Sequence, residues 1–212
     1  MKPWSNVVVV GAALLVGFAA LRGRPATAAP AIPATSARSL VVPTVDGAFA
    51  LDGELGDGIW QRAVARTGPF LGANGEAGRP YSDARLAVVR DELVVALYAA
   101  DEDVRATGPQ RDVFRVTVGN VTFEASATGE LRGAPPGTRV GHDLDGTPDD
   151  PSDDDEEWVL ELAIPLASLG LGSENDARAV RVPFSVERCD TTRSGARSCS
   201  TVRRDLVLRG VR

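Results

Sequence analysis

The feature that most constrains this sequence is a run of alternating large and smaller residues from Trp158 to Ile164 (WVLELAI). A period of two is typical of a β-strand, in which successive side chains point to opposite faces of the sheet. Four large apolar side chains then share one face: Trp158, Leu160, Leu162 and Ile164. Pro165 has no N–H to donate, so the strand ends or bulges there. The run therefore predicts a core strand of a β-sandwich.

Other short strand patterns are separated by Gly, Pro, Asp and Asn, and no long amphipathic helix is visible. Two hairpins are expected, one around Asp91-Glu92 and one around Gly119-Asn120, where Gly and Asn tolerate the positive φ of tight turns. Residues 180–188 and 200–208 read as the last two strands. We therefore expect an all-β fold, an antiparallel, jelly-roll-like β-sandwich of about nine or ten strands with little helix.

The N-terminus has the pattern of a secretory signal peptide, predicted to cover residues 1–28. A 15-residue apolar core, Val7–Leu21, is followed by the small-residue cleavage pattern Ala26-Thr27-Ala28. The alternative is an uncleaved anchor, although 15 helical residues span only ~22 Å of a ~30 Å hydrocarbon core. Contact with a membrane is expected only through such an uncleaved segment. The protein is therefore predicted to be exported and to be periplasmic, cell-surface or secreted.

Residues 29–39 are rich in Ala, Pro and Ser and are expected to form a disordered linker. The remaining residues, 40–212, are long enough for one sandwich domain, which we expect to be a monomer.

Net charge is concentrated in one place. Removing residues 1–28 leaves 20 basic against 29 acidic residues, a net charge of −9, and the segment from Asp143 to Glu157 holds nine acids and no base. The rest of the mature chain is therefore neutral. Nothing presents a basic stripe, so we expect no nucleic-acid partner.

The two cysteines, Cys189 and Cys199, stand at the ends of the last two predicted strands with nine residues between them. An exported chain lies where disulfides persist, so we expect them to be bonded; the alternative is two free thiols.

Five aspartates on the acidic, Gly- and Pro-containing loop are candidate metal ligands: Asp143, Asp145, Asp149, Asp153 and Asp155. Carboxylate oxygens are the donors that Ca²⁺ prefers, and it takes six to eight of them. The spacing is not that of an EF-hand, because Pro148 stands where the glycine would be and Asp154 where the glutamate would be. A Ca²⁺ site and a plain solvated loop both remain open.

Chemistry based on histidine is excluded by composition. His142 is the only His, and the single Lys and single Met both lie in the predicted signal peptide. We therefore expect no enzyme activity, and no haem, because one His cannot supply two axial ligands.

Two sequence elements carry a family resemblance. Leu51-Asp52-Gly53 followed by Ile59-Trp60, and the segment from Asp145-Gly146-Thr147 through Pro151-Ser152-Asp153 into the Trp158 strand, resemble the family-9 carbohydrate-binding module-like domains, which are related to DOMON sandwiches. With the hairpin near Asp91, the resemblance covers about residues 45–208. It implies an extracytoplasmic sandwich that binds sugars without catalysis, with structural Ca²⁺ in some members.

The resemblance also implies a ligand. Sugar-binding modules of this type clamp the sugar between exposed aromatic rings, whereas Trp60 and Trp158 lie in structural motifs and are expected in the core. That leaves Tyr81 and Phe70, with Arg79, as candidate ligand-binding residues for a carbohydrate or cell-surface polysaccharide.

The alternative is an extracytoplasmic structural or protein-interaction sandwich with no sugar ligand. A sugar binder should show a groove with exposed aromatic and polar residues, and an interaction module an apolar patch or an open sheet edge.

Overall fold

A computed structural model describes residues 38–47, 49–62, 64–171 and 179–209, which all belong to the unit Thr35–Arg212. The predicted signal peptide and most of the predicted linker lie outside these residues. Within the described part, no helix is both long and apolar enough to cross a membrane.

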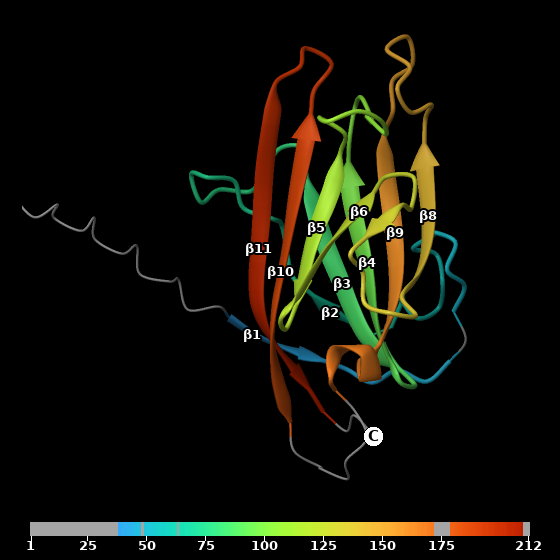
Figure 1. Cartoon of the computed structure of the whole chain (residues 1–212), viewed down its shortest axis with the longest axis vertical. Helices are drawn as coiled ribbons and strands as arrows, with labels where there is room; N and C mark the ends of the chain where they lie inside the picture. The colour runs from blue at the N-terminus through green and yellow to red at the C-terminus, as the bar shows by residue number, and fades with distance from the viewer. Residues whose placement is uncertain (1–37, 48, 63, 172–178, 210–212) are drawn as a thin grey trace, which may run out of the picture. The chain divides into compact units, whose positions relative to one another are not determined.

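The described residues form eleven strands in two facing sheets (Figure 1). The first sheet has six strands in the order β1-β11-β10-β5-β6-β7. Their bounds are β1 Arg38–Val42, β5 Val113–Val118, β6 Val121–Ser126, β7 Leu131–Arg132, β10 Val180–Thr191 and β11 Arg197–Leu208.

The second sheet has five strands in the order β2-β3-β4-β9-β8, and a single 3₁₀ turn, η1 (Leu166–Leu169), follows β9. Its bounds are β2 Ala65–Arg66, β3 Ser82–Val89, β4 Glu92–Ala100, β8 Arg139–Asp145 and β9 Glu157–Pro165. The all-β sandwich is thus confirmed. The strand count is higher than predicted because β1 and the two-residue strands β2 and β7 are held by pairing with neighbours and carry no alternating pattern of their own.

Strand β1 corrects one predicted boundary. Arg38 and Ser39, expected in the disordered linker, pair with Arg204 and Asp205 of β11, and this contact is parallel whereas the other strand pairs are antiparallel. Backbone pairing, together with burial of Val42 at the end of the strand, places these residues in the sheet.

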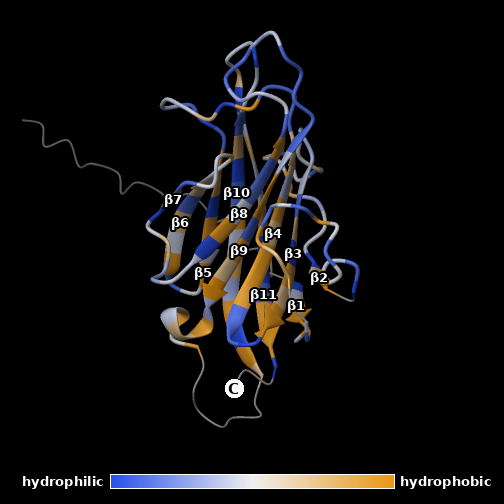
Figure 2. Ribbon diagram, turned by 90° about the vertical axis from the view of Figure 1, so that its right-hand side faces the viewer, coloured by the Kyte–Doolittle hydropathy of each residue, from blue (hydrophilic) through white to orange (hydrophobic). Residues whose placement is uncertain are grey.

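The core lies between the sheets, and β9 supplies its centre as predicted. All four side chains of its apolar face are 0% exposed: Trp158, Leu160, Leu162 and Ile164. The Trp158 ring lies 4.6 Å from the ring of Phe114 on the opposite sheet, centroid to centroid. Figure 2 shows apolar residues concentrated on the strands and hydrophilic residues on the loops at one end.

A second apolar cluster covers the outer face of the five-stranded sheet. Here the segment between β1 and β2 packs Trp60 and its neighbours onto β4 and β9. Beneath it lies Glu161, which is 0% exposed and accepts hydrogen bonds from Trp60 Nε1, from Gly53 N at 2.9 Å and from Asp52 N at 3.0 Å. The Leu51-Asp52-Gly53 and Trp60 motif therefore anchors this segment to the central strand through one buried carboxylate.

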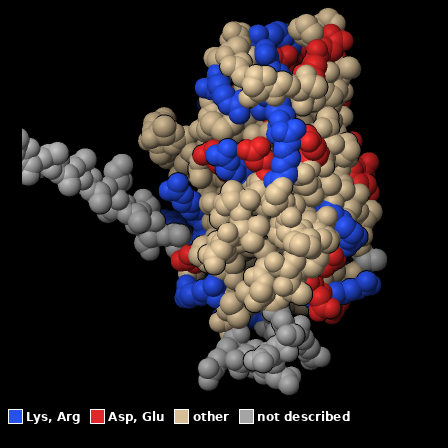
Figure 3. Space-filling model, in the orientation of Figure 1, with Lys and Arg blue, Asp and Glu red and all other residues tan. Residues whose placement is uncertain are grey.

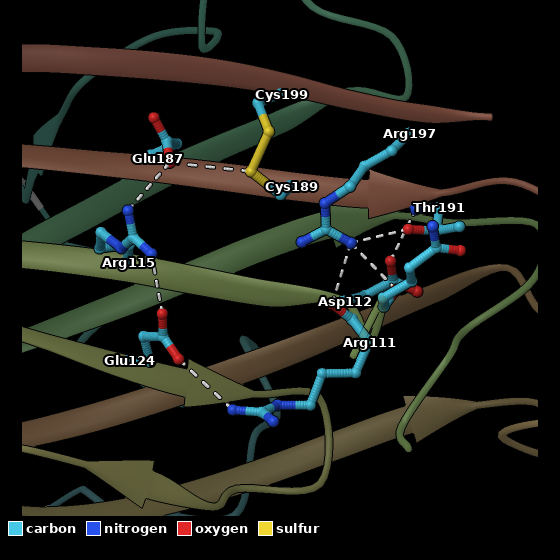
Figure 4. Close-up of a disulfide and its surroundings, with 10 residues drawn as sticks. Arg111, Asp112, Arg115, Glu124, Glu187, Cys189, Thr191, Arg197 and Cys199 are labelled. Atoms are coloured by element: carbon cyan, nitrogen blue, oxygen red, sulfur yellow. Dashed lines mark hydrogen bonds and ion pairs between the residues drawn. A yellow bond between two sulfur atoms is a disulfide. The ribbon is translucent and has the colours of Figure 1, made fainter. Parts of the chain in front are cut away.

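The disulfide is confirmed. Cys189 and Cys199 lie directly opposite each other on β10 and β11, with Cα atoms 4.2 Å apart and a bond between the sulfur atoms (Figure 4).

Removing the central indole should destabilise the sandwich strongly. Trp158→Ala leaves a cavity beside Phe114 and is expected to lower the free energy of unfolding by about 3–5 kcal/mol, measured by urea denaturation. Val180→Ala, at a side chain that is 40% exposed, is the control and should change it by no more than ~0.5 kcal/mol. Equal effects of the two substitutions would contradict the core assignment.

Candidate functional site

One end of the sandwich is hollowed where four connections meet: the β2–β3 segment, the β4–β5 segment, the β8–β9 loop and the β10–β11 turn. The hollow encloses about 1020 Å³ and opens to solvent. Figure 3 shows acidic and basic side chains crowded together at this end of the molecule. The lining includes seven acidic residues and two arginines: Asp101, Glu102, Asp103, Asp154, Asp155, Glu156, Asp190, Arg79 and Arg193.

Two of the three predicted ligand-binding residues lie at the rim of this hollow. Arg79 is exposed, and Tyr81, two residues later, is 43% exposed. The Tyr81 hydroxyl donates to Asp83 Oδ2 at 2.9 Å, and its ring lies 6.1 Å from the ring of Tyr98. The structure thus offers an aromatic surface beside polar groups at the mouth of the hollow.

The third predicted residue, Phe70, is not at the site. It is 1% exposed and packs edge-to-face against Phe114 with ring centroids 6.2 Å apart. The backbone around it runs between the sheets, since Phe70 N donates to Ser82 O and Leu71 N to Thr201 O. This course turns the Phe70 ring into the core, so its assignment as an exposed ligand-binding residue is wrong.

A polar face continues from Tyr81 onto the outer side of the five-stranded sheet. Burial raises the pKa of Tyr98 to about 12, and a hydrogen bond to Glu157 adds to the rise. Burial also lowers the pKa of Arg85, with the neighbouring Arg66 acting in the same direction. Asp83 Oδ1 and Arg85 Nε are buried without a hydrogen-bond partner, so one acceptor and one donor remain open near the tyrosines.

The floor of the hollow is a buried ionic network that the sequence did not predict. Arg188 of β10 is 1% exposed and donates to Asp101 Oδ2 and to Asp190 Oδ1, both at 2.8 Å, and to Ser82 Oγ at 3.2 Å. Asp101 also accepts from Trp158 Nε1 at 3.0 Å. Because Arg188 belongs to one sheet and its partners at Asp101 and Ser82 to the other, the network ties the two sheets together under the hollow.

Asp112 completes this floor. It is 0% exposed and accepts backbone N–H groups from Arg105 and Thr191, each at 2.7 Å. Burial raises the pKa of Asp112 to about 7, and the carboxylates of Asp101 and Asp190 contribute to the rise. Burial also raises the pKa of Asp190 to about 6, against the opposing charge of Arg188 and with the help of Asp101.

The five aspartates predicted to bind Ca²⁺ are spread out in the structure. Asp143 and Asp145, expected on a loop, belong to strand β8 and pair with β9. Asp155 is buried and accepts Val104 N at 2.6 Å. Among the described residues, no three of the five bring a ligand oxygen within 4.8 Å of one another. Calcium binding by this set stays a prediction.

No protein-family model matches the sequence, and no curated protein matches it. Solved structures do match. A family-9 carbohydrate-binding module from Caldicellulosiruptor kristjanssonii, in complex with cellotriose, is 14% identical with a TM-score of 0.59 over 82% of this chain and 94% of that one. The same module with glucose gives a TM-score of 0.60 at 14% identity, over 80% of this chain and 96% of that one.

A third similar structure is a protein from Bacteroides uniformis, provisionally described as carbohydrate-binding. It is 14% identical with a TM-score of 0.56, over 82% of this chain and all of that one. The fold of this chain is therefore that of the family-9 carbohydrate-binding modules, as the sequence motifs indicated.

The buried carboxyls should make stability depend on pH. In the folded state the pKa values of Asp112 and Asp190 lie above the ordinary aspartate value of 3.8. Folding therefore takes up protons. The free energy of unfolding should therefore rise as the pH falls from about 8 to about 5, by up to ~1.4 kcal/mol per pH unit for each proton taken up.

Urea denaturation at several pH values in chelator-containing buffer measures this slope. The charged groups of Asp101, Arg188 and Arg197 also act on the pKa values of the Asp112 and Asp190 carboxyls. Asp112→Asn should flatten the slope. A wild-type stability that is level or falls as the pH drops through this window would contradict the assignment.

Proposed function

We propose that this sandwich is a non-catalytic module that binds a carbohydrate or a cell-surface polysaccharide in the hollow at its loop end. The observation that carries the proposal is Tyr81, a 43% exposed aromatic side chain at the rim of a hollow lined by polar residues. An aromatic face supplies apolar contact to a sugar ring, and the groups around it supply hydrogen bonds to hydroxyls. The matching fold, whose solved examples hold cellotriose and glucose, supports the same ligand class.

The charge of the hollow restricts the class of carbohydrate that it could bind. Seven carboxyl groups line it against two arginines, and Arg193 is already engaged with Asp154 Oδ1 at 3.0 Å. An acidic polysaccharide would meet like charge there, so we infer a neutral ligand.

An exported location accords with the proposal. The confirmed disulfide needs an oxidising compartment, and the N-terminal pattern of the sequence supplies a route to one. We propose that the module acts at the cell surface, in the periplasm or as a secreted protein.

The interaction-module alternative has less support. The exposed large apolar side chains in the described part include Val41, Leu71 and Val180. Leu71 pairs with Thr201 in the middle of β11, whereas Val41 is level with Val207 near the strand's end. Val180 pairs with Leu208, the residue after Val207, so the side chains of Val180 and Val41 point to opposite faces of the sheet. The three residues therefore do not make one patch, and single exposed apolar residues are ordinary.

Binding to insoluble polysaccharides and to a glycan array tests the proposal, using the full chain. The wild type is expected to bind at least one neutral glycan. Tyr81→Ala should weaken that binding at least ~10-fold, the equivalent of ~1.4 kcal/mol, because it removes the aromatic face. Tyr81→Phe keeps the ring and loses only the hydrogen bond to Asp83, so it should bind nearly as well as the wild type.

Leu71→Ala is the matched control, since Leu71 is 46% exposed but lies outside the hollow. Absence of wild-type binding to every glycan, or equal binding by Tyr81→Ala, would overturn the proposal.

A further inference from the structure

A second pocket, on the outer face of the six-stranded sheet, brings four arginines together. It encloses about 230 Å³ and shares no lining residue with the hollow. Figure 3 shows charged side chains of both signs crossing this face. The arginines of the pocket come from the β4–β5 segment and from β5, β7 and β11: Arg111, Arg115, Arg132 and Arg197. Because they come from separate parts of the chain, no basic run in the sequence indicates them.

Arg115 lies at the centre of the charges in this pocket. It stands between two core residues of β5, so its side chain points away from the core. Glu124, opposite it on β6, accepts hydrogen bonds from Arg115 at 3.0 Å and from Arg111 at 3.4 Å. Glu187, opposite it on β10, approaches Arg115 to 3.8 Å. Two carboxylates therefore balance the charges of these two arginines.

The other two arginines are not balanced in the same way. Arg132 is paired with Glu130, whose Oε1 lies 2.9 Å from the arginine Nε. Arg197 makes no ion pair with a carboxylate of the residues that the structure describes. Asp190, a buried carboxyl that the charge of Arg197 also reaches, is held at 2.8 Å by Arg188. Counted over the described residues, four guanidinium groups face three glutamates, and one positive charge is left over.

Arg197 is nevertheless held in one position. Its Nη1 donates to Thr191 Oγ1 at 2.8 Å and to the backbone oxygens of Gln110, at 3.0 Å, and of Arg111, at 3.4 Å. In the described part of the chain, its Nε and Nη2 donate to no group. Figure 4 shows the edge of this guanidinium without dashed lines turned toward the disulfide. Neutral oxygens thus fix the guanidinium without compensating its charge, and one edge of it stays open.

We propose that the arginine pocket binds one oxyanionic group, a carboxylate, a sulfate or a phosphate, at the open edge of Arg197. The Nε–H and Nη2–H groups point in the same direction from the planar guanidinium and match two oxygens of such a group. A guanidinium that is already fixed loses less conformational entropy on binding than a free side chain does. Arg111 adds to the attraction: its Nε is buried with no hydrogen-bond partner among the described residues, so Glu124 compensates its charge only in part.

The size of the pocket limits the ligand to a single group. Pockets for drug-sized ligands measure about 300–1,000 Å³, and this pocket measures about 230 Å³. Two sources carry the required chemistry: a free inorganic ion and the acid group of a charged sugar. The inference is independent of the proposed carbohydrate site, since the two sites share no residue.

The test is a titration of the full chain with sodium sulfate at pH 6.5 and low ionic strength, at which surface attraction is least screened. The signals followed are those of the arginine Nε–H groups in ¹⁵N NMR spectra. Saturable shifts are expected for Arg197 and Arg111. Sodium chloride at the same ionic strength should not reproduce them.

Three substitutions separate a specific site from general attraction. Arg197→Lys keeps the charge but removes the two-donor edge, and it should weaken sulfate binding ~10-fold or more. Glu124→Gln removes a competing carboxylate and should strengthen sulfate binding ~3-fold or more. Arg203→Gln is the matched control, because Arg203 is exposed on the same face of β11 but lies outside the pocket. It should bind sulfate as the wild type does.

Titrations with sodium phosphate, sodium glucuronate and glucose identify the source of the anion. Binding of sulfate and phosphate without glucuronate indicates a free inorganic ion, and binding of glucuronate indicates the acid group of a sugar. Glucose should leave these arginine signals unchanged. Four outcomes would overturn the proposal: no saturable shift with any of the three anions; shifts that sodium chloride reproduces; undiminished sulfate binding in Arg197→Lys; or an equal loss in Arg203→Gln.

Discussion

The buried guanidinium of Arg188 holds together the end of the sandwich at which the site lies. It projects from β10 and binds Asp101, at the end of β4, and Ser82, at the start of β3. A buried charge that loses its partner costs several kcal/mol, so the two sheets cannot separate here without a large penalty. Trp158, at the centre of the core, donates to the same Asp101 and thereby links the packing of the core to the floor of the hollow.

A rigid floor is what a binding site on loops requires. Each connection around the hollow begins or ends beside a residue that the Arg188 network or Asp112 holds, namely Ser82, Asp101, Trp158 or Thr191, so the base of each connection is fixed. For the proposed carbohydrate ligand we therefore expect low ordering costs, with an affinity that depends on the few groups that face the opening. At the other side of the five-stranded sheet, Glu161 plays the equivalent structural part by fixing the Trp60 segment to β9.

The fold could be predicted from the sequence because its signals are local. Alternation around Trp158, the Gly119-Asn120 turn and the spacing of the two cysteines each depend on residues close together in the chain. Phe70 and the floor of the hollow could not be predicted in this way. Phe70 is buried because its neighbour Leu71 forms backbone hydrogen bonds with Thr201, far along the chain, and this pairing turns the Phe70 ring inward. Arg188 and Asp190 flank Cys189 in a segment whose sequence has the pattern of an ordinary hairpin end. Burial of charges depends on contacts across the sandwich that no local pattern reveals.

We have proposed that the loop end of the sandwich binds a carbohydrate, on a surface supported by the buried Arg188 network. Backbone amide chemical-shift mapping of the isotopically labelled protein, titrated with a soluble neutral oligosaccharide, tests it most directly. The shifts are expected to gather around the hollow, at Arg79, at Tyr81 and at residues 102–103, 154–156 and 192–194. Shifts that instead follow β1 and the lower part of β11, or an unchanged spectrum with every neutral oligosaccharide tried, would contradict it.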